Sequence, residues 1–158
     1  MLVNVPSGWV NMRIGFDMDG VLCDTELNFL RLLRDTPPFD KDIEKRKEMD
    51  VLYFNSRRPL LNPEHFVSED DEYYVITGRD DDVAGDVTRK WCSKFAPNAK
   101  GVFCVGKYRE PVEEDKAKKI LELELDIFID DHPVTVKKLR EMLPDKIKII
   151  QYGGRWIR

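Results

Sequence analysis

Short apolar runs alternate with amphipathic segments along most of the chain. The runs cover residues 12–16, 73–76, 102–105, 125–129 and 147–152. Their nearly continuous apolarity is typical of strands that are covered on both faces. Strands that alternate with helices are typical of a parallel α/β sheet. The pattern therefore predicts one domain over residues 1–158, with a doubly wound, Rossmann-like α/β fold and a parallel sheet of about five strands.

Three helices are predicted between these strands. The first buries apolar residues spaced four apart, and these are Val83, Val87, Trp91 and Phe95. The second begins in the acidic run 113–115, since acidic side chains favour the positive end of a helix. The third begins at Pro133, and its predicted inner face contains Val136, Leu139 and Met142.

Residues 35–72 interrupt this alternation. They contain Pro37-Pro38 and the charged run DKDIEKRKEMD. We interpret this stretch as a small helical insertion that caps one end of the sheet, because it directly follows the first strand and a helix beginning near Thr25. The alternative interpretation is a solvated charged helix with loops and no function.

Composition and charge restrict the possible functions. Hydrophobic residues make up 42% of the chain, which is enough for one continuous core, and 30 acidic against 26 basic residues give a net charge of −4. This balance argues against sequence-independent binding to nucleic acid or to an anionic membrane. The hydrophobic pattern indicates neither a membrane helix nor a signal peptide. The chain has three cysteines and no CxxC pair, which indicates neither a disulfide framework nor a zinc site. We therefore expect a cytoplasmic protein that does not bind membranes.

Acidic and hydroxyl residues follow three of the predicted strands. Residues 17–19 read Asp-Met-Asp, residues 77–79 read Thr-Gly-Arg, and residues 130–131 are a pair of aspartates. Ligands of open parallel sheets bind at the carboxyl ends of the strands, so these groups are expected to meet at one site. Several carboxylates in one place repel each other unless a cation lies among them, and oxygen ligands favour Mg²⁺.

Four segments resemble motifs of the haloacid-dehalogenase-like (HAD) superfamily, and they occur in the family's order between residues 12 and 131. They are FDMDGVLCDT, ITGR, the segment around Lys116, and IFIDD. The resemblance implies that Asp17 is the nucleophile and becomes an aspartyl-phosphate. It implies that Asp19 is the general acid and base, that Thr77 donates a hydrogen bond to the phosphoryl group, and that Lys116 holds the nucleophile and the phosphate. Lys107, just after the third strand, is the alternative catalytic lysine.

The same resemblance implies a Mg²⁺ site. Its candidate ligands are Asp17, the backbone carbonyl of Met18, Asp19, Asp130 and Asp131. Within the last pair, Asp131 resembles the direct ligand and Asp130 one that acts through water, but their order stays open.

The residue types agree with phosphate chemistry. A carboxylate attacks phosphorus only when the negative charge of the phosphate is masked, and Mg²⁺ and a lysine both do this. A second acid is then needed to protonate the leaving oxygen and to deprotonate the attacking water. Within the family that the motifs resemble, dehalogenases lack an acid at this position and ATPases carry threonine. The resemblance therefore implies that a protein with an aspartate at position 19 hydrolyses phosphomonoesters or transfers the phosphoryl group to a small acceptor.

The substrate is expected to be a nucleotide. The pattern TGR…TRKW…IDDHP is similar to 5′(3′)-deoxyribonucleotidases and to the 3′-phosphatase domains of polynucleotide kinase-phosphatases. The sixty residues from Asp17 to Thr77 are too few for the full cap of the nucleotidases, so the end of a polynucleotide is the alternative substrate. Substrate contacts are expected from Gly78, Arg79, Arg57 and Arg58, with a salt bridge to the acidic residues as the alternative role of Arg79.

Two non-enzymatic classes remain as alternatives. A phospho-receiver module also combines acidic residues, threonine, lysine and Mg²⁺ on a doubly wound sheet. A receiver has its phosphoacceptor on a middle strand and its lysine last, whereas here the nucleophile motif comes first, so the order favours the hydrolase. The third possibility is an inactive Mg²⁺-binding relative that works as an interaction protein.

Overall fold

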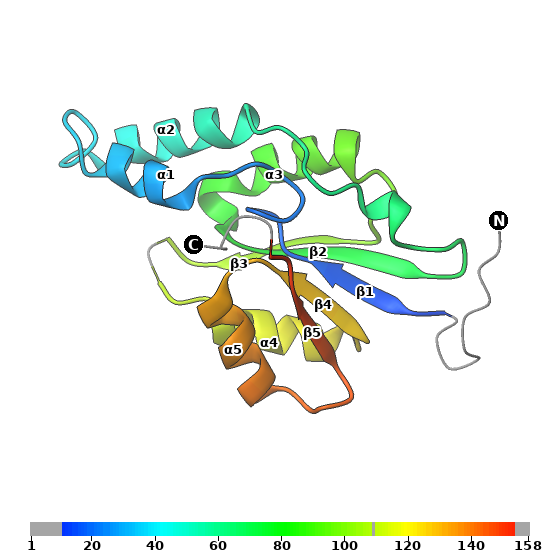
Figure 1. Ribbon diagram of the computed structural model, residues 1–158. Coiled ribbons are helices and arrows are strands. Elements are labelled where there is room, and N and C mark those ends of the chain that lie inside the picture. Colours follow the sequence, from blue (N-terminus) through cyan, green and yellow to red (C-terminus); the bar gives the residue numbers. More distant parts are fainter. Residues whose placement is uncertain (1–10, 109, 154–158) are drawn as a thin grey trace.

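The computed structural model describes residues 11–108 and 110–153. It contains a single sheet of five parallel strands in the order β3-β2-β1-β4-β5, as the hydrophobic pattern predicts (Figure 1). The strands are β1 (Arg13–Phe16), β2 (Glu72–Asp80), β3 (Val102–Gly106), β4 (Ile127–Asp130) and β5 (Lys148–Gln151). The expected α/β class and strand number are confirmed.

Helices cover both faces of this sheet. Helix α3 (Asp81–Phe95) lies on one face, whereas α4 (Glu113–Glu122) and α5 (Pro133–Met142) lie on the other (Figure 1). One apolar cluster joins Phe16 of β1 to Trp91 of α3, and a second joins Phe128 of β4 to Leu139 of α5. Because each face of the sheet has its own core, the strands are apolar on both sides, which explains their continuous hydrophobic runs.

Two details differ from the predicted elements. Strand β2 continues to Asp80 through polar residues, because its pairing with β3 resumes at Asp80 and Gly106 after a register shift beyond Thr77. Met142, predicted on the inner face of α5, is 45% exposed. The buried face of that helix runs through Val136 and Leu139 to Leu143, so the last helical residue turns outward.

The segment between β1 and β2 forms a separate helical layer. It contains α1 (Leu27–Arg34), α2 (Ile43–Asn55) and the short 3₁₀ helix η2 (Pro63–His65). A third apolar cluster fixes this layer, since Leu30 of α1, together with Met49 and Phe54 of α2, packs against Ala84 and Val87 of α3. The helical insertion therefore includes the helix that precedes residue 35, and it begins earlier than the predicted bounds of 35–72.

No helix in the described ranges has the length and apolar character that crossing a membrane requires.

Candidate active site

The site lies where the strand order reverses. From β1 the chain passes to β2 and β3 on one side and returns to β4 and β5 on the other, so the carboxyl ends of β1 and β4 flank the switch point. Ligands of doubly wound sheets bind at such points. A pocket of about 440 Å³ lies there, and its walls come from the ends of β1, β2 and β4, from α1 and α2, and from the loop that follows β3.

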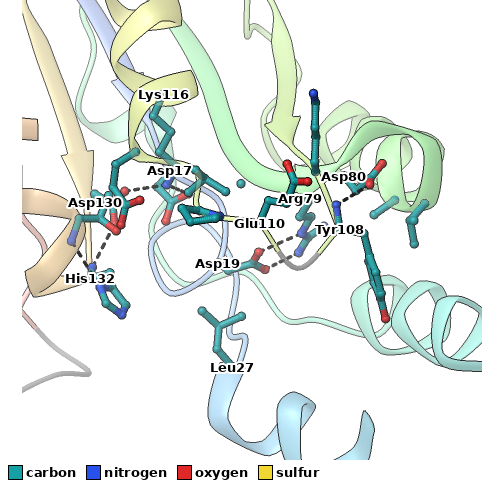
Figure 2. Close-up of a pocket in the computed structure, with 18 of the residues that line it drawn as sticks. Asp17, Asp19, Leu27, Arg79, Asp80, Tyr108, Glu110, Lys116, Asp130 and His132 are labelled. Atoms are coloured by element: carbon teal, nitrogen blue, oxygen red, sulfur yellow. Dashed lines mark hydrogen bonds and ion pairs between the residues drawn. The ribbon is translucent and has the colours of Figure 1, made fainter. Parts of the chain in front are cut away.

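Four charged residues at the base of this pocket form what we call the Asp17 cluster: Asp17, Lys116, Asp130 and Asp131. The ammonium of Lys116 donates to Oδ1 of Asp17 (3.1 Å) and to Oδ2 of Asp130 (2.8 Å) (Figure 2). All four residues are buried, and the carboxylates of the three aspartates each offer an oxygen within 4.8 Å of the others. The first turn of α4 brings Lys116 into the site, whereas Lys107 is exposed at the pocket wall.

The Asp17 cluster has more negative than positive charge. Burial raises the pKa of Asp17 well above its ordinary value, and the Asp130 carboxylate raises it further, against the opposing effect of Lys116. Burial alone would lower the pKa of Lys116, but Asp130 and Asp17 raise it, so this lysine stays protonated. Asp17 and Asp130 share one ammonium, and a second cation would lower the repulsion that Asp130 and Asp131 exert on Asp17.

The donors of the Asp17 cluster fit Mg²⁺. They are carboxylate oxygens that lie within 4.8 Å of one another, and opposite ligands of an octahedral Mg²⁺ lie about 4.2 Å apart, so the spacing is on the scale of a Mg²⁺ site. Asp130 is already engaged through both oxygens, since Oδ1 accepts from the backbone N–H of His132 (3.0 Å) and Oδ2 from Lys116. Asp130 is therefore fixed by the protein through both of its oxygens, which suits it to orienting Lys116.

Gly20 allows the close approach of Asp131. Its φ is +84°, and a Cβ built there would lie 2.1 Å from Oδ2 of Asp131. A larger residue would push the carboxylate away and would also strain the backbone.

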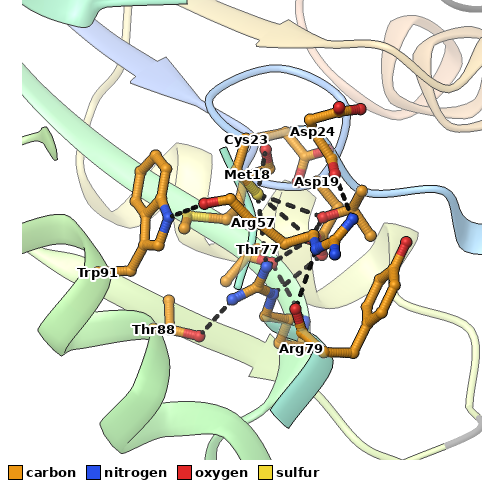
Figure 3. Close-up of polar contacts among 12 residues, drawn as sticks. Met18, Asp19, Cys23, Asp24, Arg57, Thr77, Arg79, Thr88 and Trp91 are labelled. Atoms are coloured by element: carbon orange, nitrogen blue, oxygen red, sulfur yellow. Dashed lines mark hydrogen bonds and ion pairs between the residues drawn. The ribbon is translucent and has the colours of Figure 1, made fainter. Parts of the chain in front are cut away.

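A second set of buried residues, which we call the Asp19 cluster, is formed by Asp19, Thr25, Arg79 and Thr88. Arg79 donates to both carboxylate oxygens of Asp19, with 3.0 Å between Nε and Oδ2 (Figure 3). Thr25 donates to Oδ1 of the same carboxylate (2.6 Å), and Nη1 of Arg79 donates to the hydroxyl of Thr88 (2.9 Å). Burial would raise the pKa of Asp19, but the charge and hydrogen bonds of Arg79 lower it below its ordinary value.

Two predicted metal ligands are corrected by these contacts. The carbonyl oxygen of Met18 accepts from the backbone N–H groups of Val21 (3.2 Å), Leu22 (2.9 Å) and Cys23 (3.1 Å), so it points into the turn after β1 and not toward a metal. The carboxylate of Asp19 is bound by Arg79 and lies outside the group of three aspartates. The sequence left two roles open for Arg79, a substrate contact or a salt bridge to the acidic residues. In the structure Arg79 forms the salt bridge, with Asp19.

The end of β2 is packed closely against the loop that follows β3. Thr77 is fully buried, and its hydroxyl accepts from the backbone N–H of Arg79 (3.3 Å). Gly78 lines the pocket, and a Cβ there would lie 3.1 Å from both methyl groups of Val112. The backbone oxygen of Gly78 would lie 1.9 Å from a Cβ at Gly106, so a glycine at position 106 is required for this contact.

Arg57 and Arg58, predicted to contact substrate, are not among the described residues that line the pocket, which is a second correction. Arg57 donates to the backbone oxygens of Asp24 (3.1 Å) and Tyr53 (3.0 Å), and its guanidinium lies 3.8 Å from the centre of the Tyr53 ring. Arg58 is exposed, and its carbonyl accepts from the N–H of Asp24 (2.7 Å). Both residues lie beyond the end of α2, where they connect the insertion to the turn after β1.

The insertion contributes pocket residues that sequence analysis did not identify. Helix α1 lines the pocket with Leu27, Arg31 and Arg34, at spacings of four and three that place them on one helical face. Helix α2 contributes Asp50 and Phe54, again four apart. Arg34 donates to both oxygens of Asp50 (2.9 and 2.6 Å), so an ion pair joins the two helices. The spacing was visible in the sequence, but nothing there indicated that this face covers the site.

Helix ends supply the remaining walls. Asp80 caps α3 by accepting from the N–H of Asp82, and it also accepts from the N–H of Tyr108 (2.6 Å), which holds the loop after β3. His132 caps α5, since its ring nitrogen Nδ1 accepts from the N–H of Thr135 (3.4 Å).

No protein-family model and no curated protein sequence matches this chain. Among solved structures, it is similar to a HAD-superfamily hydrolase of subfamily IA from Geobacter sulfurreducens, with a TM-score of 0.54, 12% identity and 86% of each chain covered. It is also similar to a HAD-family enzyme from Bacteroides thetaiotaomicron solved with magnesium and inorganic phosphate, with a TM-score of 0.53, 14% identity, and 92% of this chain and 97% of that chain covered.

A third similar structure is a chain of the Pnkp1/Rnl/Hen1 RNA repair complex, with a TM-score of 0.56 and 14% identity. The alignment covers 96% of this protein but only 45% of that chain, so this protein spans less than half the length of that relative. Together these structures show that the chain has the fold of HAD-superfamily hydrolases, as its ordered motifs imply.

Proposed function

We propose that this protein is a Mg²⁺-dependent phosphomonoesterase that acts through an aspartyl-phosphate on Asp17. The observation that carries the proposal is the position of Asp17, which lies at the switch point of the sheet between Lys116 and two further buried aspartates. A carboxylate in that position faces a pocket large enough for a phosphorylated small molecule.

Mg²⁺ would be held by Asp17 and Asp131, with Asp130 orienting Lys116. When bound, the ion would neutralise charge on the phosphate oxygens and so lower the barrier to attack by an anionic nucleophile.

Asp17 is the proposed nucleophile in the first step. Lys116 binds Oδ1 and fixes the orientation of the carboxylate, so Oδ2 is the oxygen that attacks phosphorus. A bond from Asp17 to phosphorus forms while the bond from phosphorus to the leaving oxygen breaks. Lys116 stays protonated throughout, because the Asp17 cluster raises its pKa, and it can therefore stabilise charge on the phosphoryl group.

Asp19 is the proposed acid and base. Arg79 favours its deprotonated form, which is the form needed to accept a proton from the water that attacks the aspartyl-phosphate. An incoming phosphate dianion near this carboxylate would raise its pKa and favour the protonated form, which the leaving oxygen needs in the first step.

Thr77 and Gly78 are the proposed phosphoryl contacts at the end of β2. The hydroxyl of Thr77 accepts from the N–H of Arg79, so its own proton is left to donate. Gly78 lines the pocket and has no side chain to obstruct the phosphate.

We propose that α1 and α2 form a small cap and that the substrate is a nucleotide, as in 5′- or 3′-nucleotidases. The volume of about 440 Å³ exceeds that of a phosphate, and Leu27, Phe54 and Tyr108 provide apolar and aromatic surface for a nucleoside. A polynucleotide 3′-phosphatase is the second candidate, favoured by the similarity to a chain of an RNA repair complex.

The test is a panel of phosphorylated compounds, with mononucleotides, 3′- and 5′-phosphorylated oligonucleotides and an aryl phosphate, each assayed with Mg²⁺ and with chelator. We expect release of phosphate only with Mg²⁺, and inhibition by Ca²⁺, whose looser coordination would disturb the geometry of attack. Full activity in chelator would contradict the metal assignment. No release from any compound would instead support a phospho-receiver or an inactive Mg²⁺-binding interaction protein.

A further inference from the structure

The basic residues that line the pocket fall into two groups. Four of them face a carboxylate within 4.0 Å, and these pairs are Arg34 with Asp50, Arg79 with Asp19, Lys116 with Asp17 and Asp130, and Lys138 with Glu113. The other two, Arg31 and Lys107, form no ion pair with any residue in the described ranges.

Arg31 and Lys107 line the same pocket from two elements that contact each other. Arg31 lies on the pocket face of α1, between Leu27 and Arg34. Lys107 directly precedes Tyr108, whose ring centre lies 5.5 Å from the guanidinium of Arg34. The loop after β3 therefore approaches α1 at this point.

This part of the wall is separate from the proposed catalytic groups. Leu27, on the same face of α1 as Arg31, lies beyond Asp19 as seen from Asp17 and Lys116 (Figure 2). The phosphate that is hydrolysed would be balanced by Lys116 and the metal at the base of the pocket. Two further cations at the α1 wall are not needed for that phosphate.

We propose that Arg31 and Lys107 bind a second phosphate of the substrate, one that is not hydrolysed. The substrate is then a nucleotide with two phosphates, and this inference rests on the proposed phosphatase function. The second phosphate is either the other end of a nucleoside 3′,5′-bisphosphate or an internucleotide phosphate next to the phosphorylated end of an oligonucleotide. The other four cations already face a carboxylate, which offsets part of their charge, whereas the charges of Arg31 and Lys107 are not offset by any carboxylate of the described residues.

The experiment measures KM and kcat for three substrates with the same nucleoside: a monophosphate, a 3′,5′-bisphosphate and a phosphorylated dinucleotide. Wild type is expected to have a KM about tenfold lower for one or both two-phosphate substrates than for the monophosphate, equivalent to ~1.4 kcal/mol. Preference for the bisphosphate or for the dinucleotide identifies the source of the second phosphate. Raising the salt concentration should reduce the preference, because exposed charges are screened.

Variants assign the effect to residues. Arg31→Ala and Lys107→Ala are each expected to raise KM for the preferred two-phosphate substrate about tenfold, and to change KM for an aryl phosphate less than twofold. Arg31→Lys should retain part of the preference. Arg58→Ala is the matched control, since it removes an exposed arginine of the insertion that does not line the pocket, and it should leave all KM values unchanged.

The two hypotheses fail in different ways. If wild type hydrolyses the aryl phosphate but has equal KM values for one and two phosphates, the second-phosphate site is wrong and the phosphatase stands. If nothing is hydrolysed, the phosphatase itself is wrong. The comparison of substrates on wild type needs no variant, so misfolding of Arg31→Ala cannot obscure the result, and thermal unfolding of each variant checks its fold. Equal losses for all substrates in both variants would also overturn the site.

Discussion

Asp17 and Asp19 are two residues apart and both buried, yet their surroundings shift their pKa values in opposite directions. Asp17 shares one lysine with Asp130 and lies near Asp131, so its carboxylate is held among like charges and its pKa is raised. Asp19 has an arginine of its own, which binds both of its oxygens and lowers its pKa.

The difference shows how one short motif supports two chemical roles. The Asp17 cluster has fewer positive than negative charges, so binding of a cation would stabilise it. This suits a nucleophile that must approach an anionic phosphate. The Asp19 cluster is balanced within itself, and four hydrogen bonds fix it between β2, α3 and the turn after β1. The positively charged residues of the two clusters come from opposite faces of the sheet. Lys116 is on α4, whereas Arg79 lies near the end of β2 beside α3.

Replacing Asp17 tests the first cluster and has the largest expected effect. Asp17→Asn removes the attacking oxygen, so phosphate release should fall to background for every substrate. The same change removes one of three crowded carboxylates, so the metal-free variant should be at least as stable as wild type in thermal unfolding. Residual activity with any substrate would show that another residue is the nucleophile.

Replacing Asp19 should harm alkyl and aryl substrates to different degrees. Nitrophenolate leaves without much protonation, whereas a sugar alkoxide needs a proton, so the pre-steady-state burst of Asp19→Asn should fall roughly 10²–10⁴-fold more for the sugar phosphate. The burst is used because water attack in the second step also depends on Asp19.

Structural damage is the alternative explanation for Asp19→Asn. Removing one partner of a buried ion pair costs about 3–5 kcal/mol, so the free energy of unfolding must be measured beside the burst. Equal slowing of both bursts would mean that Asp19 positions the site without transferring a proton.

The two clusters also predict opposite dependence of stability on pH, measured in chelator. In the folded protein the pKa of Asp17 is raised, so the unfolded chain loses this proton at a lower pH than the folded chain does. The free energy of unfolding therefore falls as pH rises above the ordinary aspartate pKa of ~3.9. The folded pKa of Asp19 is lowered, so its contribution is present above that value and is lost as pH falls through the folded pKa.

Chemical unfolding between pH 3 and pH 8 checks these signs. Asp17→Asn should reduce the fall in the free energy of unfolding that occurs as pH rises above about 4. Asp19→Asn should reduce the fall that occurs as pH drops below about 4. A slope unchanged in both variants would contradict the assigned environments.

The sequence predicted the sheet and the Asp17 cluster because both depend on local patterns. Continuous apolar runs define strands with two covered faces, and the residues after β1 and β4 meet wherever the strands are parallel. The insertion was predicted less well. Its α1 was assigned to the main fold. Arg57 and Arg58 were predicted to contact substrate and Arg31 was not identified, because only packing against α3 decides which face of α1 covers the pocket.

Two errors have different physical origins. The Met18 carbonyl was predicted to bind metal, but the local turn after β1 uses it for three backbone hydrogen bonds with residues 21–23. Asp19 was grouped with the metal ligands, but the bidentate contact with Arg79, sixty residues away, holds its carboxylate outside that group. This second contact is set by the tertiary fold and has no local signature in the sequence.

The smallest predicted effect comes from a residue that touches Asp19 only through Arg79. Thr88 is fully buried, and its hydroxyl accepts from Nη1 of Arg79 at 2.9 Å. Thr88→Val keeps the shape but leaves this N–H without an acceptor, so the variant should lose ~1–3 kcal/mol of stability. Thr135→Val is the stability control on the Asp17 side, since the Thr135 hydroxyl is not among the described buried polar atoms that lack a partner and it donates to no carboxylate of the Asp17 cluster, so the change should be near neutral. Arg79 keeps both bonds to Asp19 in Thr88→Val, so the ratio of alkyl to aryl bursts should change only a fewfold. A ratio as large as that of Asp19→Asn would mean that Thr88, and not the Arg79 charge, controls the proton on Asp19.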